Sequence, residues 1–126
     1  MARILVVDDE EHIRLLVANV LVQHGYEVDT ASDGAEAIGE LAKTNYDLMI
    51  IDRNMPKMSG IEAITVVRAS RKFKGLRILM LTAERFPTNI VKAFESGIDG
   101  YMVKPFDLDG LLVKVEKILL QQRSVE

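Results

Sequence analysis

Hydrophobic residues gather in five short runs along the chain, and few polar positions interrupt them. The runs are rich in Val, Ile and Leu, which favour strands. Most of them lack the alternation of polar and apolar residues that marks a strand with one solvent-exposed face, so we expect both faces of these strands to be buried, as in parallel sheets covered by helices. The predicted strands are Ile4–Val7, Val28–Ala31, Leu48–Ile51, Ile78–Leu81 and Tyr101–Val103.

The segments between these runs repeat apolar residues at steps of three and four, which predicts helices that pack by one face. Glycines at positions 25, 75 and 97 fall where helices are expected to end. A strand–helix unit repeated five times predicts an α/β fold of (βα)5 type, with right-handed crossovers and a doubly wound, five-stranded parallel sheet. Ligands bind such sheets at the carboxyl ends of the strands, near the point where the strand order reverses.

Composition narrows the class of protein. The chain has 126 residues, so we expect one domain over residues 1–126. It has no cysteine, which excludes disulfides, thiolate metal sites and cysteine nucleophiles. A net charge of −3 argues against general binding to nucleic acid. No apolar run approaches the ~20 residues needed to span a bilayer, so we expect a cytoplasmic protein without membrane contact.

Polar residues that can react or bind ions follow four of the predicted strands. Asp8 and Asp9 follow the first strand, Asp52 the third, Thr82 the fourth and Lys104 the fifth. Because the carboxyl ends of parallel strands share one edge of the sheet, these side chains should converge on one pocket. Carboxylates this close repel each other unless one is protonated or a cation lies among them.

The chemistry of this set points to phosphate and a hard cation. Oxygen ligands without cysteine or a histidine pair suit Mg2+ better than zinc. Lys104 would bring a compact positive charge to a phosphate, and the Thr82 hydroxyl could donate to a phosphoryl oxygen. A carboxylate such as that of Asp52 can act as a nucleophile and form an acyl phosphate.

Each residue also has an ordinary structural interpretation. Asp8 and Asp9 could cap a helix, and Asp52 could belong to a turn. Thr82 could cap the next helix, and Lys104 could be a solvated lysine. Their joint occurrence at four strand ends favours a shared chemical role over four coincidences.

Four longer segments of the chain carry a family resemblance: ILVVDDE, DLMIIDRNMPKMSG, ILMLTAE and GYMVKPF. Together they resemble the CheY-like receiver domain of bacterial two-component response regulators, over essentially the whole chain. The resemblance implies a flavodoxin-like fold. It also implies signal transduction in which the domain accepts a phosphoryl group from a histidine kinase.

The resemblance assigns the acidic residues as follows. Asp52 is expected to be the phosphoacceptor. Asp9 and Asp52 are expected to bind Mg2+ directly, together with the backbone carbonyl of Asn54. Asp8 is expected to act on the metal mainly through a bound water. Asn54 and Glu84 match the residues that tune phosphoryl lifetime in fast-cycling members of the family.

The resemblance also implies a conformational switch. Thr82 is expected to move to the phosphoryl group, and Lys104 to pair with it next to a cis bond to Pro105. Tyr101 is expected to be the aromatic switch residue, although it could be an ordinary aromatic at the edge of a strand. The fourth helix, fifth strand and fifth helix would then form the altered face.

The resemblance further implies partners. We expect a sensor histidine kinase or a phosphotransfer protein as phosphodonor, and a downstream protein or output domain as target. The domain would be a monomer or a weak, phosphorylation-dependent dimer, with no direct contact to nucleic acid. It would not be an enzyme in the usual sense, because it would catalyse only its own phosphorylation and dephosphorylation.

Some residues depart from known subgroups of the family. A Phe86–Pro87 step replaces the lysine-containing loop of the chemotaxis protein, which puts the flagellar-motor partner of that protein in doubt. Transcriptional regulators that dimerise through the switch face carry an acidic pair that reads Asp99–Gly100 here, so that dimer should be weakened. Arg68, Arg71, Lys72, Lys74 and Arg77 form a basic run, which we interpret as a solvated helix end.

Three other functions fit the sequence less well. A phosphatase of the haloacid dehalogenase type needs a second Asp where Asn54 stands. A flavodoxin-like redox carrier needs a phosphate loop rich in Ser, Thr and Gly where the first loop is acidic. A receiver that binds without phosphorylation is disfavoured because every expected group is present. The possibility that this receiver belongs to a larger regulator stays open.

Overall fold

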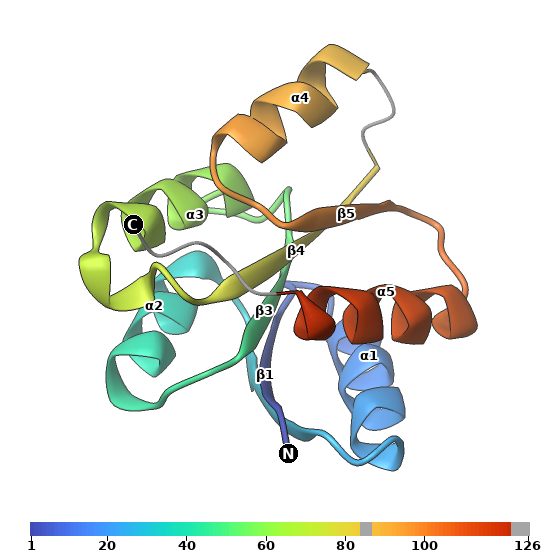
Figure 1. The fold of residues 1–126 in the computed structure, drawn as a ribbon. Helices are drawn as coiled ribbons and strands as arrows, with labels where there is room; N and C mark the ends of the chain where they lie inside the picture. The colour runs from blue at the N-terminus through green and yellow to red at the C-terminus, as the bar shows by residue number, and fades with distance from the viewer. Residues whose placement is uncertain (84–86, 122–126) are drawn as a thin grey trace.

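The computed structural model describes residues 1–83 and 87–121, which form five strand–helix units in chain order (Figure 1). The strands are β1 (Arg3–Val7), β2 (Glu27–Ala31), β3 (Leu48–Asp52), β4 (Arg77–Thr82) and β5 (Gly100–Val103). The helices are α1 (Glu11–Gln23), α2 (Gly34–Lys43), α3 (Gly60–Ala69), α4 (Pro87–Glu95) and α5 (Leu108–Leu120), with a short 3-10 turn, η1 (Arg71–Phe73), after α3. The predicted α/β fold is confirmed.

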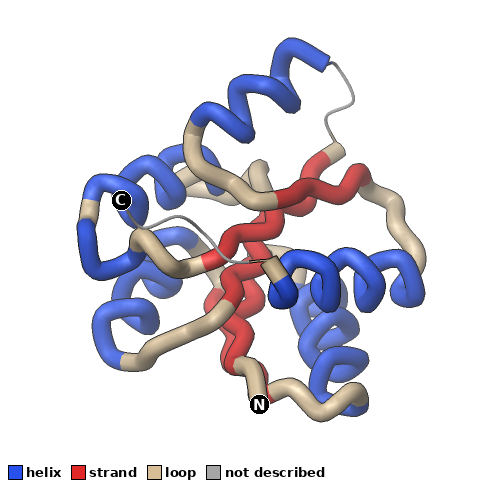
Figure 2. Tube along the Cα trace, in the orientation of Figure 1, coloured by secondary structure: helices blue, strands red, loops and turns tan. Residues whose placement is uncertain are grey.

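The five strands form one parallel sheet in the order β2-β1-β3-β4-β5, which lies at the centre of the domain (Figure 2). The chain runs outward from β1 to β2, then crosses to the other side of β1 and continues in one direction. The reversal of strand order therefore falls between β1 and β3. Ligand sites of doubly wound sheets open at this point, at the carboxyl ends of the strands.

Two separate hydrophobic cores cover the faces of the sheet. Figure 1 shows α1 and α5 together on one side, and α2 and α3 on the other. Successive side chains of a strand point to opposite faces. Accordingly Leu5 and Val7 of β1 belong to the core under α2 and α3, whereas Ile4 and Val6 belong to the core under α1 and α5. All five residues of β3 are buried, as expected for a central parallel strand.

Few of the described side chains of α4, at residues 88–95, are buried. Ala93 is its one fully buried side chain among those described, and Val91 is 55% exposed. Its Phe94 ring meets the Tyr101 ring of β5 edge to face, with centroids 5.7 Å apart. Figure 1 shows α4 standing at the end of the sheet away from α1. Little apolar area therefore fixes its position.

The ends of the helices follow local chemistry. Ser59 and Glu62 form a reciprocal capping box at the start of α3, and the Asp33 carboxylate caps α2. Gly25 and Gly97 adopt the positive φ expected of glycines that end helices. Gly75 instead follows η1, because α3 already ends at Ala69. Within residues 1–83 and 87–121, each helix falls short of what crossing a membrane requires in length and apolarity.

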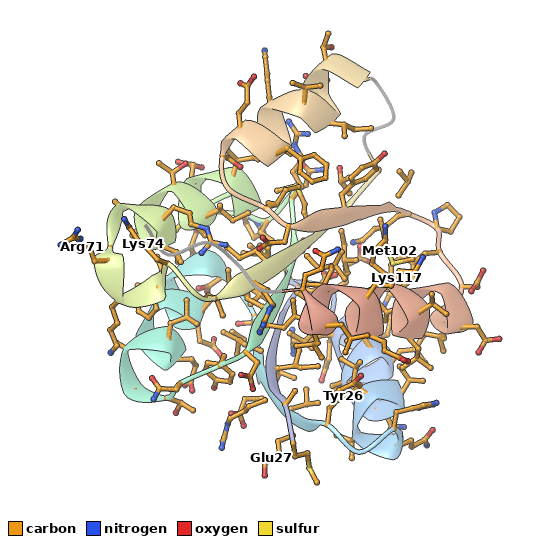
Figure 3. The ribbon with its side chains drawn as sticks, viewed as in Figure 1. Tyr26, Glu27, Arg71, Lys74, Met102 and Lys117 are labelled. Atoms are coloured by element: carbon orange, nitrogen blue, oxygen red, sulfur yellow. The ribbon has the colours of Figure 1, made fainter. Side chains whose placement is uncertain are left out.

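One residue of the basic run is not solvated, which corrects our interpretation of that segment. The side chain of Arg68 is only 12% exposed. Its guanidinium donates to the backbone carbonyls of Phe73, Leu76 and Gly97, and it lies 3.3 Å from the Asp99 carboxylate. Arg71, by contrast, points away from the domain at this end of α3 (Figure 3). Arg68 thus ties α3 to the loops that enter β4 and β5.

Candidate functional site

Three carboxylates and one ammonium group meet at the carboxyl edge of the sheet. One carboxylate oxygen from each of Asp8, Asp9 and Asp52 lies within 4.8 Å of the other two. The Lys104 Nζ lies 3.3 Å from an oxygen of Asp8 and 3.3 Å from an oxygen of Asp52. These residues end or follow β1, β3 and β5. The predicted convergence is observed for these four residues, and Thr82, the fifth residue of the prediction, ends the strand β4 between β3 and β5.

Burial makes the electrostatics of this cluster strong. Asp8 is fully buried, and Asp52 is only 4% exposed. Burial, and then the charge of Asp8, raise the pKa of Asp52, although Lys104 partly offsets both. Burial lowers the pKa of Lys104, but Asp52 and Asp8 outweigh it, so that this pKa ends above its ordinary value. Lys104 therefore carries its charge between two carboxylates at neutral pH.

Three hydrogen bonds hold Asp8 at the end of β1. Its backbone N–H donates to the Ala31 carbonyl at 3.2 Å, and one carboxylate oxygen accepts from the Glu10 backbone N–H at 2.9 Å. Its backbone carbonyl accepts from the Arg14 guanidinium at 2.9 Å. The backbone and the side chain of Asp8 are thus both fixed. Asp9, the next residue, is exposed at the rim of the site.

The loop after β3 passes unusually close to the start of α3. The Gly60 N–H donates to the Arg53 carbonyl at 2.7 Å. A Cβ atom on Gly60 would overlap the Asp52 carbonyl oxygen, so only glycine fits without a shift of the backbone. Within the loop, Met58 N–H donates to the Pro56 carbonyl at 2.7 Å around Lys57, whose φ is 69°. That tight three-residue turn directs the loop back toward α3.

The two predicted switch residues lie on neighbouring strands. Thr82 is buried at the end of β4, and its carbonyl accepts from the Lys104 N–H at 2.7 Å. Tyr101 stands opposite Met80 in the β4–β5 register and is partly buried. The Lys104–Pro105 bond is cis, as the family resemblance implied. Asn54 is exposed in the loop after Asp52, whereas Glu84 and Phe86 lie outside the described residues.

An apolar groove that sequence reasoning missed adjoins the site. It has a volume of about 320 Å³ and lies between α1 and the loop from β5 to α5. The residues that line it are Ile13, Leu16, Val17, Lys104, Pro105, Phe106 and Leu108. Leu15 and Leu16 of α1 are about half exposed, at 52% and 49%. The sequence shows the apolar residues of α1, but it does not show which of them are buried and which stay exposed.

Comparison with known proteins agrees with this geometry. Residues 4–116 match the model of the response regulator receiver domain family. The chain is 40% identical over 117 residues to the chemotaxis protein CheY of Pseudomonas aeruginosa, which covers 92% of this chain and 94% of that protein. The structure of the chemotaxis response regulator CheY4 of Vibrio cholerae is similar, with a TM-score of 0.90 and 41% identity, over 94% of this chain and 98% of that one.

The structure of a third similar protein is that of a complex. This is the response regulator protein TrrA of Thermotoga maritima in complex with Mg2+–BeF, with a TM-score of 0.82 and 42% identity, over 94% of this chain and 99% of that one. The family match and these likenesses each extend over most of the chain. They agree with a (βα)5 sheet that gathers three carboxylates and a lysine at its carboxyl edge. The known role of the response regulator receiver domain family is phosphorylation-dependent signalling rather than enzymatic turnover in the usual sense. The chain therefore belongs to this family, as a CheY-like domain of two-component signalling.

Proposed function

We propose that Asp52 accepts a phosphoryl group from a phosphohistidine donor with the help of Mg2+, and that this modification changes the face formed by α4, β5 and α5. The observation that carries the proposal is the cluster in which Asp8, Asp9 and Asp52 converge while Lys104 bridges two of them. Such a set can bind both a hard cation and the oxygens of a phosphoryl group.

The donor set fits Mg2+. Three carboxylates facing one ammonium leave an excess of negative charge in a site where Asp8 and Asp52 are buried and Asp9 is exposed, and all the candidate ligands are oxygens. Asp9, Asp52 and the backbone carbonyl of Asn54 would hold the ion directly, and Asp8 would act through a bound water. When bound, the ion neutralises charge on the phosphoryl oxygens during transfer.

The residues of the chain supply the rest of the reaction. A carboxylate oxygen of Asp52 attacks the phosphorus of the donor, so that a P–O bond forms and the P–N bond to the imidazole breaks. The imidazole nitrogen keeps the electron pair and takes up a proton from water. Lys104 and the Thr82 hydroxyl then bind phosphoryl oxygens. Later attack of water on phosphorus releases inorganic phosphate and restores the carboxylate of Asp52.

The acyl phosphate would act on the switch face through charge. A phosphoryl group adds roughly −1.5 to −2 of charge and three acceptor oxygens. Attraction of Thr82 to those oxygens would free space for Tyr101 to turn inward, away from Phe94. Because α4 is held by little buried surface, a change of this size can shift its position. A downstream protein or output domain would bind the altered face.

The phosphodonor partner must dock where its phosphohistidine can reach Asp52. The groove between α1 and the β5–α5 loop adjoins Lys104 and is lined by apolar side chains such as Ile13 and Phe106. Together with the exposed Leu15 and Leu16, it suits the apolar surface of a histidine kinase or phosphotransfer protein. We propose this groove as the docking place of that partner.

We propose that residues 1–126 form one receiver domain, that it works in the cytoplasm, and that it is a monomer or a weak, phosphorylation-dependent dimer. The orientation of Asp99 supports weak dimerisation at most. Its carboxylate accepts from the Ile78 N–H at 2.8 Å and pairs with Arg68, so it is directed into the domain rather than toward a second copy.

Intact mass spectrometry tests the central proposal. The wild-type protein, incubated with Mg2+ and acetyl phosphate, should gain the mass of one phosphoryl group, and Asp52→Asn should gain none. Addition of a chelator should also abolish the gain. A folded wild-type protein that gains no mass with Mg2+ present would refute phosphoacceptance and leave a receiver that binds its partners without phosphorylation.

A further inference from the structure

Arg14 is a charged residue that the proposed reaction does not use but that touches its site. It is the fourth residue of α1, it is half-buried, and its guanidinium donates to the backbone carbonyl of Asp8 at 2.9 Å. Both residues flank the β1–α1 loop, which carries Asp9. Arg14 thus reaches from the helix back across the loop to the end of the strand.

Helix stability does not account for a cation at this place. The amino end of a helix favours negative charge, because its free N–H groups carry partial positive charge. The residue before α1, Glu10, makes no side-chain capping bond. An arginine here therefore opposes the helix dipole, and its compensating contact is the bond to the Asp8 carbonyl.

The orientation of the Asp9 carboxylate depends on the backbone that Arg14 holds. Within residues 1–83 and 87–121, the Asp9 side chain makes no hydrogen bond or ion pair of its own. Asp8 and Asp9 share one planar peptide unit, so the direction of the Asp8 carbonyl fixes the direction of the Asp9 N–Cα bond, from which the Asp9 side chain branches. Fixing that carbonyl therefore limits where the Asp9 side chain can lie, and one of its carboxylate oxygens lies within 4.8 Å of oxygens of Asp8 and Asp52.

We infer that Arg14 is a positioning residue, which holds the Asp8–Asp9 peptide so that the Asp9 carboxylate is ready to bind the divalent cation. This inference rests on the proposed function, because it assumes that the acidic cluster binds Mg2+. Residues that orient metal ligands commonly affect metal affinity by about 10- to 100-fold when they are removed. For a bond to a backbone carbonyl we expect the lower end of that range.

Positioning and simple charge predict opposite results for the loss of Arg14. The guanidinium lies near the acidic cluster and repels a second cation, so charge alone predicts that its removal tightens Mg2+ binding. Positioning predicts that its removal weakens Mg2+ binding, because the Asp9 carboxylate loses its fixed orientation. The sign of the change therefore separates the two roles.

A matched control comes from the loop after β3. Arg53 directly follows Asp52, and its side chain makes no hydrogen bond or ion pair within the part of the chain that the structure describes. Arg53→Met removes one positive charge near the cluster without removing a bond. We expect its Mg2+ affinity to equal or exceed that of the wild type.

The experiment is calorimetric titration of Mg2+ into the wild type, Arg14→Met, Arg14→Lys and Arg53→Met. Far-UV circular dichroism and melting temperature without Mg2+ report whether each variant is folded. Arg14→Met should bind Mg2+ about tenfold more weakly than the wild type, and Arg14→Lys should fall between them. Should Arg14→Met fail to fold, Arg14→Lys carries the same comparison, because a lysine keeps the charge but loses the planar geometry of the guanidinium.

Two results would overturn the inference. If Arg14→Met, or Arg14→Lys in its place, binds Mg2+ as tightly as the wild type or more tightly, then Arg14 contributes charge and no positioning, while the proposed function stands. If the wild type itself does not bind Mg2+, then both the inference and the proposed metal site are wrong. Weaker binding by Arg14→Met with unchanged or tighter binding by Arg53→Met supports the positioning role.

Discussion

Replacing Arg68 with methionine tests how far the stability of the domain depends on one buried guanidinium. Methionine keeps an unbranched apolar side chain but offers no donor to the three backbone carbonyls that Arg68 now binds. The substitution also removes the cation beside Asp99, whose side chain is only 15% exposed. The loss thus combines a broken ion pair with three carbonyls that lose a donor.

The magnitude follows from the burial of these groups. Removing one partner of a buried ion pair costs about 3–5 kcal/mol. Arg68 and Asp99 keep some contact with water, and Asp99 still accepts from the Ile78 N–H, which places the pair at the lower end of that range. The Phe73 carbonyl still accepts from the Leu76 N–H, whereas the Leu76 and Gly97 carbonyls each add roughly 1 kcal/mol unless water replaces the lost bond. We expect the free energy of unfolding to fall by about 3–5 kcal/mol, a large part of the ~5–15 kcal/mol typical of a domain.

Urea unfolding followed by far-UV circular dichroism measures this change, since the chain has no tryptophan to report by fluorescence. The exposed Arg71 lies three residues away, and Arg71→Met should change stability by less than about 0.5 kcal/mol. Adding Asp99→Asn to Arg68→Met should recover part of the loss, because a neutral amide costs less to bury than a carboxylate that has lost its neighbouring cation. A loss below about 1 kcal/mol for Arg68→Met would refute the reasoning, because it would mean that water hydrates the carbonyls and the Asp99 carboxylate when the guanidinium is absent.

Three further predictions concern other parts of the domain. Burial, and then the hydrogen bond to Asp29, raise the pKa of Tyr46 from 10.0 to about 12. The neutral Tyr46 therefore stabilises the fold below pH 10, and this stabilisation is lost as the pH rises toward 12. Tyr46→Phe should flatten the dependence of stability on pH between pH 10 and 12, and an unchanged slope would contradict this. Gly60→Ala should cost about 1–3 kcal/mol and slow the labelling of Asp52, because the new Cβ meets the Asp52 carbonyl; a melting temperature equal to that of the wild type would show that the loop yields. Leu16→Glu should slow transfer from a phosphodonor protein more than transfer from acetyl phosphate; equal slowing with both donors would place the defect outside docking.

The strands and the order of the elements were predictable from the pattern of apolar residues. Each predicted strand lies within an observed one, and the differences are one residue at an end, or two in the case of β4. The strands β1, β3 and β4 each contain an uninterrupted run of buried apolar residues, which is typical of central strands of a parallel sheet. The 3-10 turn η1 was not predicted, because it depends on how Arg68 draws the segment after α3 against the loops of the sheet.

The convergence of Asp8, Asp9, Asp52 and Lys104 was also predictable, since parallel strands bring their carboxyl ends to one edge whatever the details of packing. The sequence did not reveal that Lys104 bridges Asp8 and Asp52. It did not reveal the burial that raises the pKa of Asp52 either. Both depend on distances across the sheet and on the helices that exclude water from it.

Taken by itself, the sequence determined the fold class, the position of the site and the chemical types of its residues, because hydrophobic spacing and residue type are local properties. Only the tertiary structure decided the role of Arg68 in tying loops together, the contact of Arg14 with Asp8, and the close passage of Gly60 by Asp52. Each of these is a contact between separate elements. Two arginines with the same local surroundings can therefore differ, as Arg68 and Arg71 do, because folding buries one of them and leaves the other in water.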